Sequence, residues 1–189
     1  MIKGKRLDLK PVDRGDIETL RVWRNKHGQN FFTSDTITKQ QQRAWYQHYQ
    51  DNYGRDFMYL IKLKDGTPIG TIALYNVEMA DRTADIGRIL LLEQFRSQGY
   101  MEEALEMLVK EAFEKIRVWK LRLSCYLDNA GAISAYHKVG FQSLLRPVMI
   151  MEMKNSDISP EKPLTLHDSA YDVEGDDYES SCSNVKVGE

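Results

Sequence analysis

The stretch EQFRSQGYMEEAL, residues 93–105, places charged and polar residues and a glycine between an apolar run and a helical pattern. The first backbone N–H groups of a helix have no internal partner and lie at the positive end of the helix dipole. A turn that enters a helix can therefore bind an anion; Gly99 permits close backbone approach or a positive φ, and Arg96 brings a fixed charge. We expect a phosphate-binding turn, although one glycine in a polar turn also fits an ordinary solvated helix entry.

The chain on either side of this turn alternates strand and helix patterns. ADIGRILLL predicts a mostly buried strand, and MEEALEMLVKEAFEK predicts a helix because its apolar residues recur every three or four positions. The element order predicts an α/β or α+β domain with a single sheet and helices on both faces. The expected strands are 7–10, 57–63, 67–77 (a hairpin with the preceding strand), 84–92, 121–127 and 148–153. The expected helices begin near Asp13 (apolar residues Ile17, Leu20, Val22 and Trp23) and after Thr36 or Thr38, and span 101–115 and 129–140.

Charge divides the 189 residues into two regions. Residues 155–189 hold nine acidic and two basic residues, a net charge of −7, and show no apolar period. The remaining 24 basic and 19 acidic residues give residues 1–154 a net charge of +5. We therefore expect one domain at residues 1–154 and an acidic, disordered C-terminal tail at residues 155–189. A contact of this tail with the basic domain is a further hypothesis.

Composition also limits the classes of partner. The basic charge of the domain is not concentrated in the stripe expected of a nucleic-acid binder, so we expect no nucleic acid. No run of 18 apolar residues occurs, and the N-terminus lacks a signal-peptide pattern, so we expect a cytoplasmic protein with no membrane partner. Cys125, Cys182 and the four histidines lack metal-ligand spacing, so we expect reduced thiols and no metal.

Three motifs together resemble the signatures of the GCN5-related N-acetyltransferase (GNAT) superfamily, and the element order agrees with that family over residues 5–153. One is the family's pyrophosphate loop, Q/R-x-x-G-x-G/A. Another is an asparagine after a strand, a tyrosine seven residues later and a Gly-Phe pair; the third is a hairpin ending in Pro-Ile-Gly. The resemblance implies a mixed central sheet splayed at its middle strands. The matching residues are Arg96-Ser97-Gln98-Gly99-Tyr100-Met101, Asn129, Tyr136, Gly140-Phe141 and Pro68-Ile69-Gly70.

The resemblance implies that acetyl-CoA is the co-substrate and lies where strand 84–92 splays from strand 121–127. Backbone groups of residues 89–91 would pair with the pantetheine arm and polarise the thioester carbonyl. The turn would hold the diphosphate. Met101 stands where the family has Gly or Ala, so its side chain must point away or narrow the site. The residues expected to bind the cofactor are Ile89, Leu90, Leu91, Arg96, Ser97, Gln98, Gly99, Tyr100, Met101 and Asn129.

The same resemblance assigns the chemical step. An amine attacks the thioester directly, and Tyr136 would protonate the departing thiolate, although a tyrosine on a helix face also fits core packing. The amine must first lose a proton to a carboxylate, often through water. Glu78 and Asp85, at the ends of two strands beside the expected cleft, are the candidate bases, although surface carboxylates are common at strand ends.

The N-terminal half usually builds the acceptor pocket in this superfamily. Its Trp-Arg-Asn and aromatic pairs resemble the branch that acetylates nucleotide-linked 4-amino-sugars for surface glycan synthesis. Aromatic planes can stack on a sugar or base, and Arg24 can neutralise a diphosphate. We expect Arg24, Asn25 and Phe31 to bind the acceptor. Trp23 and Trp45 also fit core packing, which is favoured for Trp45.

Other acceptors remain open at this point. A protein α-amine such as a ribosomal N-terminus, a polyamine and an aminoglycoside are alternatives from neighbouring branches. Residues 20–52 hold two acidic residues against five Lys and Arg residues, which disfavours a cationic acceptor. A non-catalytic CoA-binding module is the alternative from another class, and a homodimer is possible because dimers are common in the family.

Overall fold

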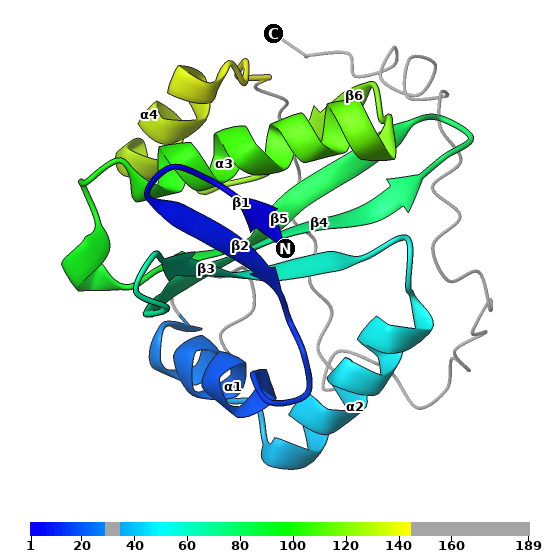
Figure 1. Ribbon diagram of the computed structural model, residues 1–189, viewed down its shortest axis with the longest axis vertical. Helices are drawn as coiled ribbons and strands as arrows, with labels where there is room; N and C mark the ends of the chain where they lie inside the picture. The colour runs from blue at the N-terminus through cyan, green and yellow to red at the C-terminus, as the bar shows by residue number, and fades with distance from the viewer. Residues whose placement is uncertain (29–34, 145–189) are drawn as a thin grey trace, which may run out of the picture. The chain divides into compact units, whose positions relative to one another are not determined.

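A six-stranded sheet lies at the centre of the computed structural model, which describes residues 1–28 and 35–144 (Figure 1). The strands follow one another across the sheet in sequence order. Neighbours are antiparallel except β5 and β6, which run parallel. This mixed sheet confirms the predicted fold class. The strands are β1 (Ile2–Lys3), β2 (Leu7–Pro11), β3 (Phe57–Leu63), β4 (Pro68–Glu78), β5 (Thr83–Leu91) and β6 (Lys120–Arg122).

Helices cover both faces of the sheet, with α1 and α2 on one face and α3 and α4 on the other (Figure 1). Side chains alternate along β3, so Tyr59 and Ile61 join the core beneath α3, whereas Met58 and Leu60 join the core beneath α1 and α2. The helices are α1 (Ile17–Lys26), α2 (Lys39–Asp51), α3 (Tyr100–Glu111), which continues as the π-helical η3 (Ala112–Ile116), and α4 (Ala130–Val139); the 3-10 helix η2 (Glu93–Phe95) precedes α3.

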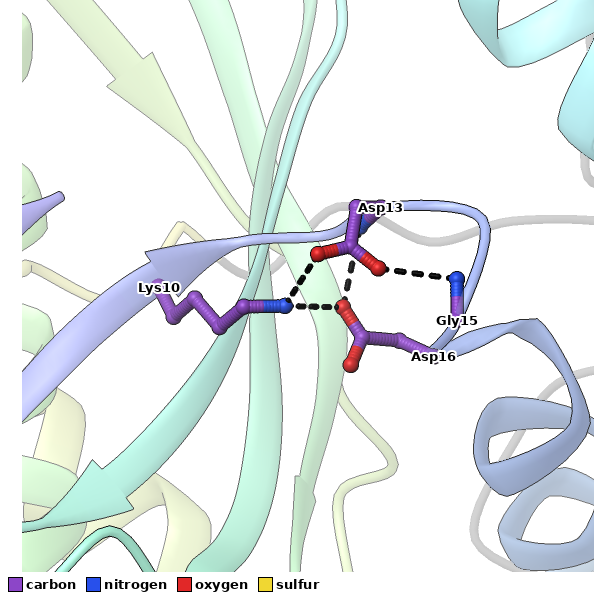
Figure 2. A network of polar contacts seen from close by, with 4 residues as sticks. All are labelled: Lys10, Asp13, Gly15 and Asp16. Carbon is purple, nitrogen blue, oxygen red and sulfur yellow. Dashed lines mark hydrogen bonds and ion pairs between the residues drawn. The ribbon is translucent and has the colours of Figure 1, made fainter.

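A small network of charges holds the turn between β2 and α1 (Figure 2). Lys10 Nζ lies 2.7 Å from Asp13 Oδ2 and 2.6 Å from Asp16 Oδ2. The N–H of Gly15 donates to Asp13 Oδ1 at 2.8 Å, and the N–H of Asp13 donates to Asp16 Oδ2 at 2.9 Å. The hydrogen bond from Lys10 lowers the pKa of Asp13. Because the turn is fixed, α1 lies on the sheet with Leu20 buried.

Side-chain caps determine where two other helices begin. Thr38 accepts a hydrogen bond from the N–H of Gln41, and the Gln41 side chain accepts from the N–H of Thr38, a capping box that starts α2. Asn129 Oδ1 accepts from the N–H of Ala132 at 3.1 Å and starts α4. Gly140, at a φ of 106°, ends α4. Thr38 and Gly140 confirm the predicted bounds.

Several details differ from the sequence prediction, which did not include the strand β1. The first helix begins at Ile17, after the turn that contains Asp13. Val22 is exposed, because it lies about 200° around the helix from the buried Leu20. The strand predicted at 121–127 is β6 (Lys120–Arg122), which ends where its pairing with β5 ends. The strand predicted at 148–153 and the tail predicted at 155–189 lie outside the described residues.

The strands β4 and β5 approach closely and then bulge. A Cβ on Gly70 would overlap the carbonyl oxygen of Leu90, so a larger residue would push the strands apart. The register shifts between Thr71 and Ala73, and Arg88 in the bulge has a φ of 49°. The buried Thr71 donates from Oγ1 to the carbonyl oxygen of Arg88 at 2.8 Å. A bulge re-aims a side chain, and this one directs Arg88 toward α2, where its guanidinium faces Trp45.

Candidate active site

A large cavity opens where β5 and β6 diverge. The two strands pair over residues 83–85 of β5, and the rest of that strand borders a cavity of about 1160 Å³. The cavity is lined by residues 86–91, by the turn before α3, by residues 124–126 and by α4 with its N-terminal approach. This is the splay that the sequence predicts, and it brings the two main motifs together.

The turn before α3 has the backbone shape of an anion site. Gly99 is the N-cap of α3 at a φ of 74°, and Ser97 has a φ of 59°. Arg96, Ser97 and Gly99 all line the cavity. Arg96 also donates from Nε to the carbonyl oxygen of Leu91 at 3.2 Å, which ties the turn to the end of β5. Helix N–H groups beside an arginine suit a diphosphate.

Arg6, which the sequence does not single out, contacts this turn from outside the cavity lining. It donates from Nη1 to the carbonyl oxygen of Gln98 at 2.8 Å and from Nη2 to that of Gly99 at 2.7 Å. Its Nε forms an ion pair with Glu103 Oε2 at 2.7 Å. Burial raises the pKa of Glu103, but the hydrogen bonds and charge of Arg6 outweigh that effect and leave the pKa lowered. The contact joins residues too far apart in the chain for any local pattern to reveal.

The predicted acid lines the cavity from α4. Tyr136, on α4, is buried and packs edge-to-face on Phe141 with the ring centres 6.4 Å apart. Burial, with a smaller contribution from Cys125, raises the pKa of Tyr136 to about 12. The phenol therefore keeps its proton near neutral pH, as a proton donor must. Asn129 lines the same cavity while its Oδ1 caps α4.

Met101 also lines the cavity, one residue into α3. Its side chain is partly buried and packs against the core between α3 and the sheet. The thioether therefore takes space at the edge of the turn and contributes to the core at the same time.

Arg88, beside an aromatic cluster, borders another part of the cavity. Arg88 and Tyr75 line it, and the Arg88 guanidinium lies 4.8 Å from the Tyr75 ring centre and 5.9 Å from that of Trp45. Asp56 holds this guanidinium in a two-pronged contact of 2.6 and 2.7 Å. Trp45 stacks on Tyr49 with ring centres 5.5 Å apart. The sequence analysis did not identify Arg88, Tyr75 or Asp56. The signal that could have indicated Arg88 is a charged residue within the mostly apolar run ADIGRILLL.

The two carboxylates expected to act as base lie beyond the cavity lining. Glu78 Oε2 is 2.6 Å from Arg55 Nη2. Asp85 Oδ1 is 2.9 Å from Arg122 Nε, and its Oδ2 accepts from Asn76 Nδ2 at 2.9 Å. Each carboxylate is therefore matched by an arginine.

Of the three residues expected to bind the acceptor, the structure describes two, Arg24 and Asn25. Asn25 exchanges two hydrogen bonds with the backbone of Ile37, at 2.8 and 2.9 Å, and so holds the segment that leads into α2. Burial lowers the pKa of Arg24 while the charge of Asp35 opposes that shift. Phe31 lies outside the described residues. Neither Arg24 nor Asn25 lines the cavity.

Within residues 1–28 and 35–144, no group of three or more His, Cys, Asp or Glu side chains is arranged to hold a metal ion. None of the helices in those ranges is long and apolar enough to cross a membrane.

The chain belongs to the acetyltransferase (GNAT) domain family, whose profile matches residues 6–142. It is 26% identical over 152 residues to the probable N-acetyltransferase YjcK of Bacillus subtilis (strain 168), covering 75% of this chain and 83% of the relative. It is therefore an acetyl-CoA-dependent N-acetyltransferase.

Solved structures share the fold. The spermidine N-acetyltransferase of Vibrio cholerae in complex with CoA and spermine aligns with a TM-score of 0.70 at 15% identity, over 79% of this chain and 88% of that one. FdhC, a nucleotide-linked sugar GNAT, aligns with a TM-score of 0.68 at 20% identity, over 78% and 84%. The acetyl donor supplies the thioester, and all the residues expected to bind it except Gln98 line the cavity.

The backbone shape of the turn predicts the effect of Gly99→Ala. A Cβ at a φ of 74° is strained and would lie 3.3 Å from Arg6 Nη2. We expect CoA binding, measured by isothermal titration calorimetry, to weaken about tenfold, or by about 1.4 kcal/mol.

Gly66→Ala is the matched control, because Gly66 has a φ of 91° in the β3–β4 turn, away from the cavity. Gly66→Ala should lower the free energy of unfolding about as much as Gly99→Ala does, and its CoA affinity should stay at the wild-type value. Equal CoA affinity for Gly99→Ala and wild type would contradict an anion site at this turn.

Proposed function

We propose that the acceptor is the 4-amino group of a nucleotide-linked deoxy amino sugar, acetylated in surface glycan synthesis. The observation that carries the proposal is Arg88, which lines the same cavity as the phosphate-binding turn and whose guanidinium is held among aromatic rings. An acceptor placed there meets a cation for a phosphate and flat rings for a sugar or base.

The position of Arg88 is set by both covalent and non-covalent constraints. The bulge in β5 turns its side chain out of the strand, and Asp56 holds two of its nitrogens. A guanidinium has five N–H donors, so a group held at one edge still offers donors to a ligand. Preorganised donors bind an oxyanion at a lower entropic cost than a mobile side chain.

The paired carboxylates around this end of the sheet disfavour a polycationic acceptor. Asp56, Glu78 and Asp85 each form an ion pair with an arginine. A polyamine or aminoglycoside would have to displace those arginines to gain a carboxylate partner. Arg88 lines the cavity and has N–H donors beyond the two that Asp56 accepts, so a phosphate can bind it without displacing a carboxylate. FdhC, which shares the fold, is a nucleotide-linked sugar GNAT.

In the proposed reaction the amine nitrogen attacks the thioester carbonyl carbon, and the carbon–sulfur bond then breaks. The proton of the amine passes to Glu78 or Asp85 through water, because neither carboxylate lines the cavity. The CoA thiolate takes the phenol proton of Tyr136, which burial keeps in place. Backbone N–H groups of residues 89–91 stabilise the carbonyl oxygen as negative charge develops.

The acceptor is tested by thiol release from acetyl-CoA with four amines in parallel: a UDP- or TDP-linked 4-amino-sugar, spermidine, kanamycin and a peptide beginning with Ala or Ser. We expect selective turnover of the nucleotide sugar. Preferred turnover of another amine would refute this acceptor, as would silence across the panel from protein that still binds CoA.

A variant of Arg88 sharpens this test. Arg88→Lys keeps the charge but loses the planar fork, so the KM for the nucleotide sugar should rise about tenfold while the KM for acetyl-CoA stays unchanged. Arg82→Lys is the control, because Arg82 lies 4.7 Å from the Trp119 ring centre and is not part of the cavity lining.

The acid role predicts the behaviour of Tyr136→Phe. Phenylalanine keeps the contact with Phe141 but cannot donate a proton, so kcat should fall about 100-fold to 1,000-fold with CoA affinity unchanged. Steady-state kinetics and calorimetry measure the two quantities, and Tyr53→Phe, at an exposed tyrosine, is the control. An unchanged kcat would mean that the ring serves packing alone.

A further inference from the structure

Arg6, in the turn between β1 and β2, holds the outer side of the phosphate-binding turn. Its guanidinium donates to two successive carbonyl oxygens, those of Gln98 and Gly99, at 2.8 and 2.7 Å. Glu103 holds Arg6 in turn, because its Oε1 accepts from the Arg6 backbone N–H at 2.8 Å and its Oε2 from Nε at 2.7 Å. The guanidinium also lies 4.8 Å from the ring centre of Tyr100. Four contacts thus fix one guanidinium against one turn.

Peptide geometry converts this contact into an orientation. In a trans peptide the carbonyl and the following N–H point in opposite directions, and both peptides concerned are trans. The Gly99 carbonyl also accepts from the N–H of Glu103 at 3.2 Å, so α3 and Arg6 orient it together, whereas Arg6 holds the Gln98 carbonyl. In both peptides the N–H group, that of Gly99 or Tyr100, points away from Arg6. Gly99 and Tyr100 line the cavity, whereas Arg6 does not. These N–H groups are consequently presented on the cavity side.

We infer that Arg6 is a positioning residue for the acetyl donor. It lies outside the cavity lining and keeps two backbone donors aimed at where the diphosphate of acetyl-CoA would lie. The turn is then already ordered in the folded protein, so binding of the donor costs less conformational entropy. The inference rests on the acetyl-CoA-dependent activity and is independent of the acceptor.

Lysine cannot replace arginine in this role. A guanidinium donates to both carbonyls and to Glu103 through separate nitrogens in one plane, whereas an ammonium is a compact point charge. Arg6→Lys therefore preserves the charge next to Glu103 and loses the geometry. A second effect must be separated from this one, because removal of Arg6 leaves the Glu103 carboxylate near the phosphate site, where it would repel an anion.

The test measures the affinities of CoA and of S-acetylpantetheine, which lacks the diphosphate, by calorimetry and ligand-observed NMR titration. For Arg6→Ala and Arg6→Lys we expect CoA affinity to fall about tenfold, while the affinity for S-acetylpantetheine stays at the wild-type value. A purely structural role would lower both affinities together or neither, and either result would overturn the inference.

The double variant Arg6→Ala with Glu103→Gln separates orientation from charge. If Arg6 acts by orientation, CoA binding stays weak in the double variant; recovery of wild-type affinity would show that repulsion by Glu103 was the whole effect and would overturn the inference. Lys64→Ala, which removes an exposed ion pair with Asp8, controls for the loss of a surface charge and should bind both ligands as wild type does. If Arg6→Ala does not fold, Arg6→Lys provides the same comparison.

Discussion

The divergence of β5 from β6 beyond Asp85 is the constraint on which the rest of the structure depends. β5 is paired with β4 along one edge, but its other edge borders a cavity from Ile86 onward. Backbone groups along an open strand edge need partners, and the cost of leaving them unpaired rises when water is excluded. A ligand with an amide-bearing arm can supply those partners, which is what the pantetheine portion of acetyl-CoA offers.

Two parts of this open strand carry different chemistry. The C-terminal end of β5 leads into a turn whose glycine and helix N-terminus suit a diphosphate. The middle of β5 carries the bulge that sends Arg88 to the α1–α2 face of the sheet, among the aromatic residues that pack beneath those helices. Donor and acceptor can thus reach the same strand from different sides, and the bulge lies between them. Gly70 and Thr71 maintain this geometry, one by its lack of a side chain and the other by holding the Arg88 carbonyl.

Local patterns were enough to predict most of the fold. The hairpin of β3 and β4, the helix that starts at Thr38 and the helix that ends at Gly140 each depend on residues close together in sequence. The extent of β6 could not be predicted this way, because its length is decided by how far it stays beside β5. Apolar residues after Arg122 look strand-like whether or not a partner is present.

The residues of the candidate site differ in the same way, because some have short-range sequence signatures and others depend on long-range contacts. The turn around Gly99 and the helix that carries Tyr136 have short-range signatures, and they do line one cavity. Arg6 and Asp56 act through contacts with Gln98 and Arg88 that are remote in sequence, and nothing in their neighbourhoods marks them. Asn25 is the opposite case, a residue that a local motif did mark. The motif led to a predicted substrate-binding role, whereas the structure shows the Asn25 amide hydrogen-bonded to the backbone of Ile37.

Hydrogen–deuterium exchange of the full chain with and without CoA tests the central claim most directly. If the donor lies along the open edge of β5, CoA should slow exchange of backbone amides in residues 86–101, with the largest change at residues 89–91 and at the turn before α3. Protection confined to other segments, with residues 86–101 exchanging as fast as in the free protein, would contradict the account.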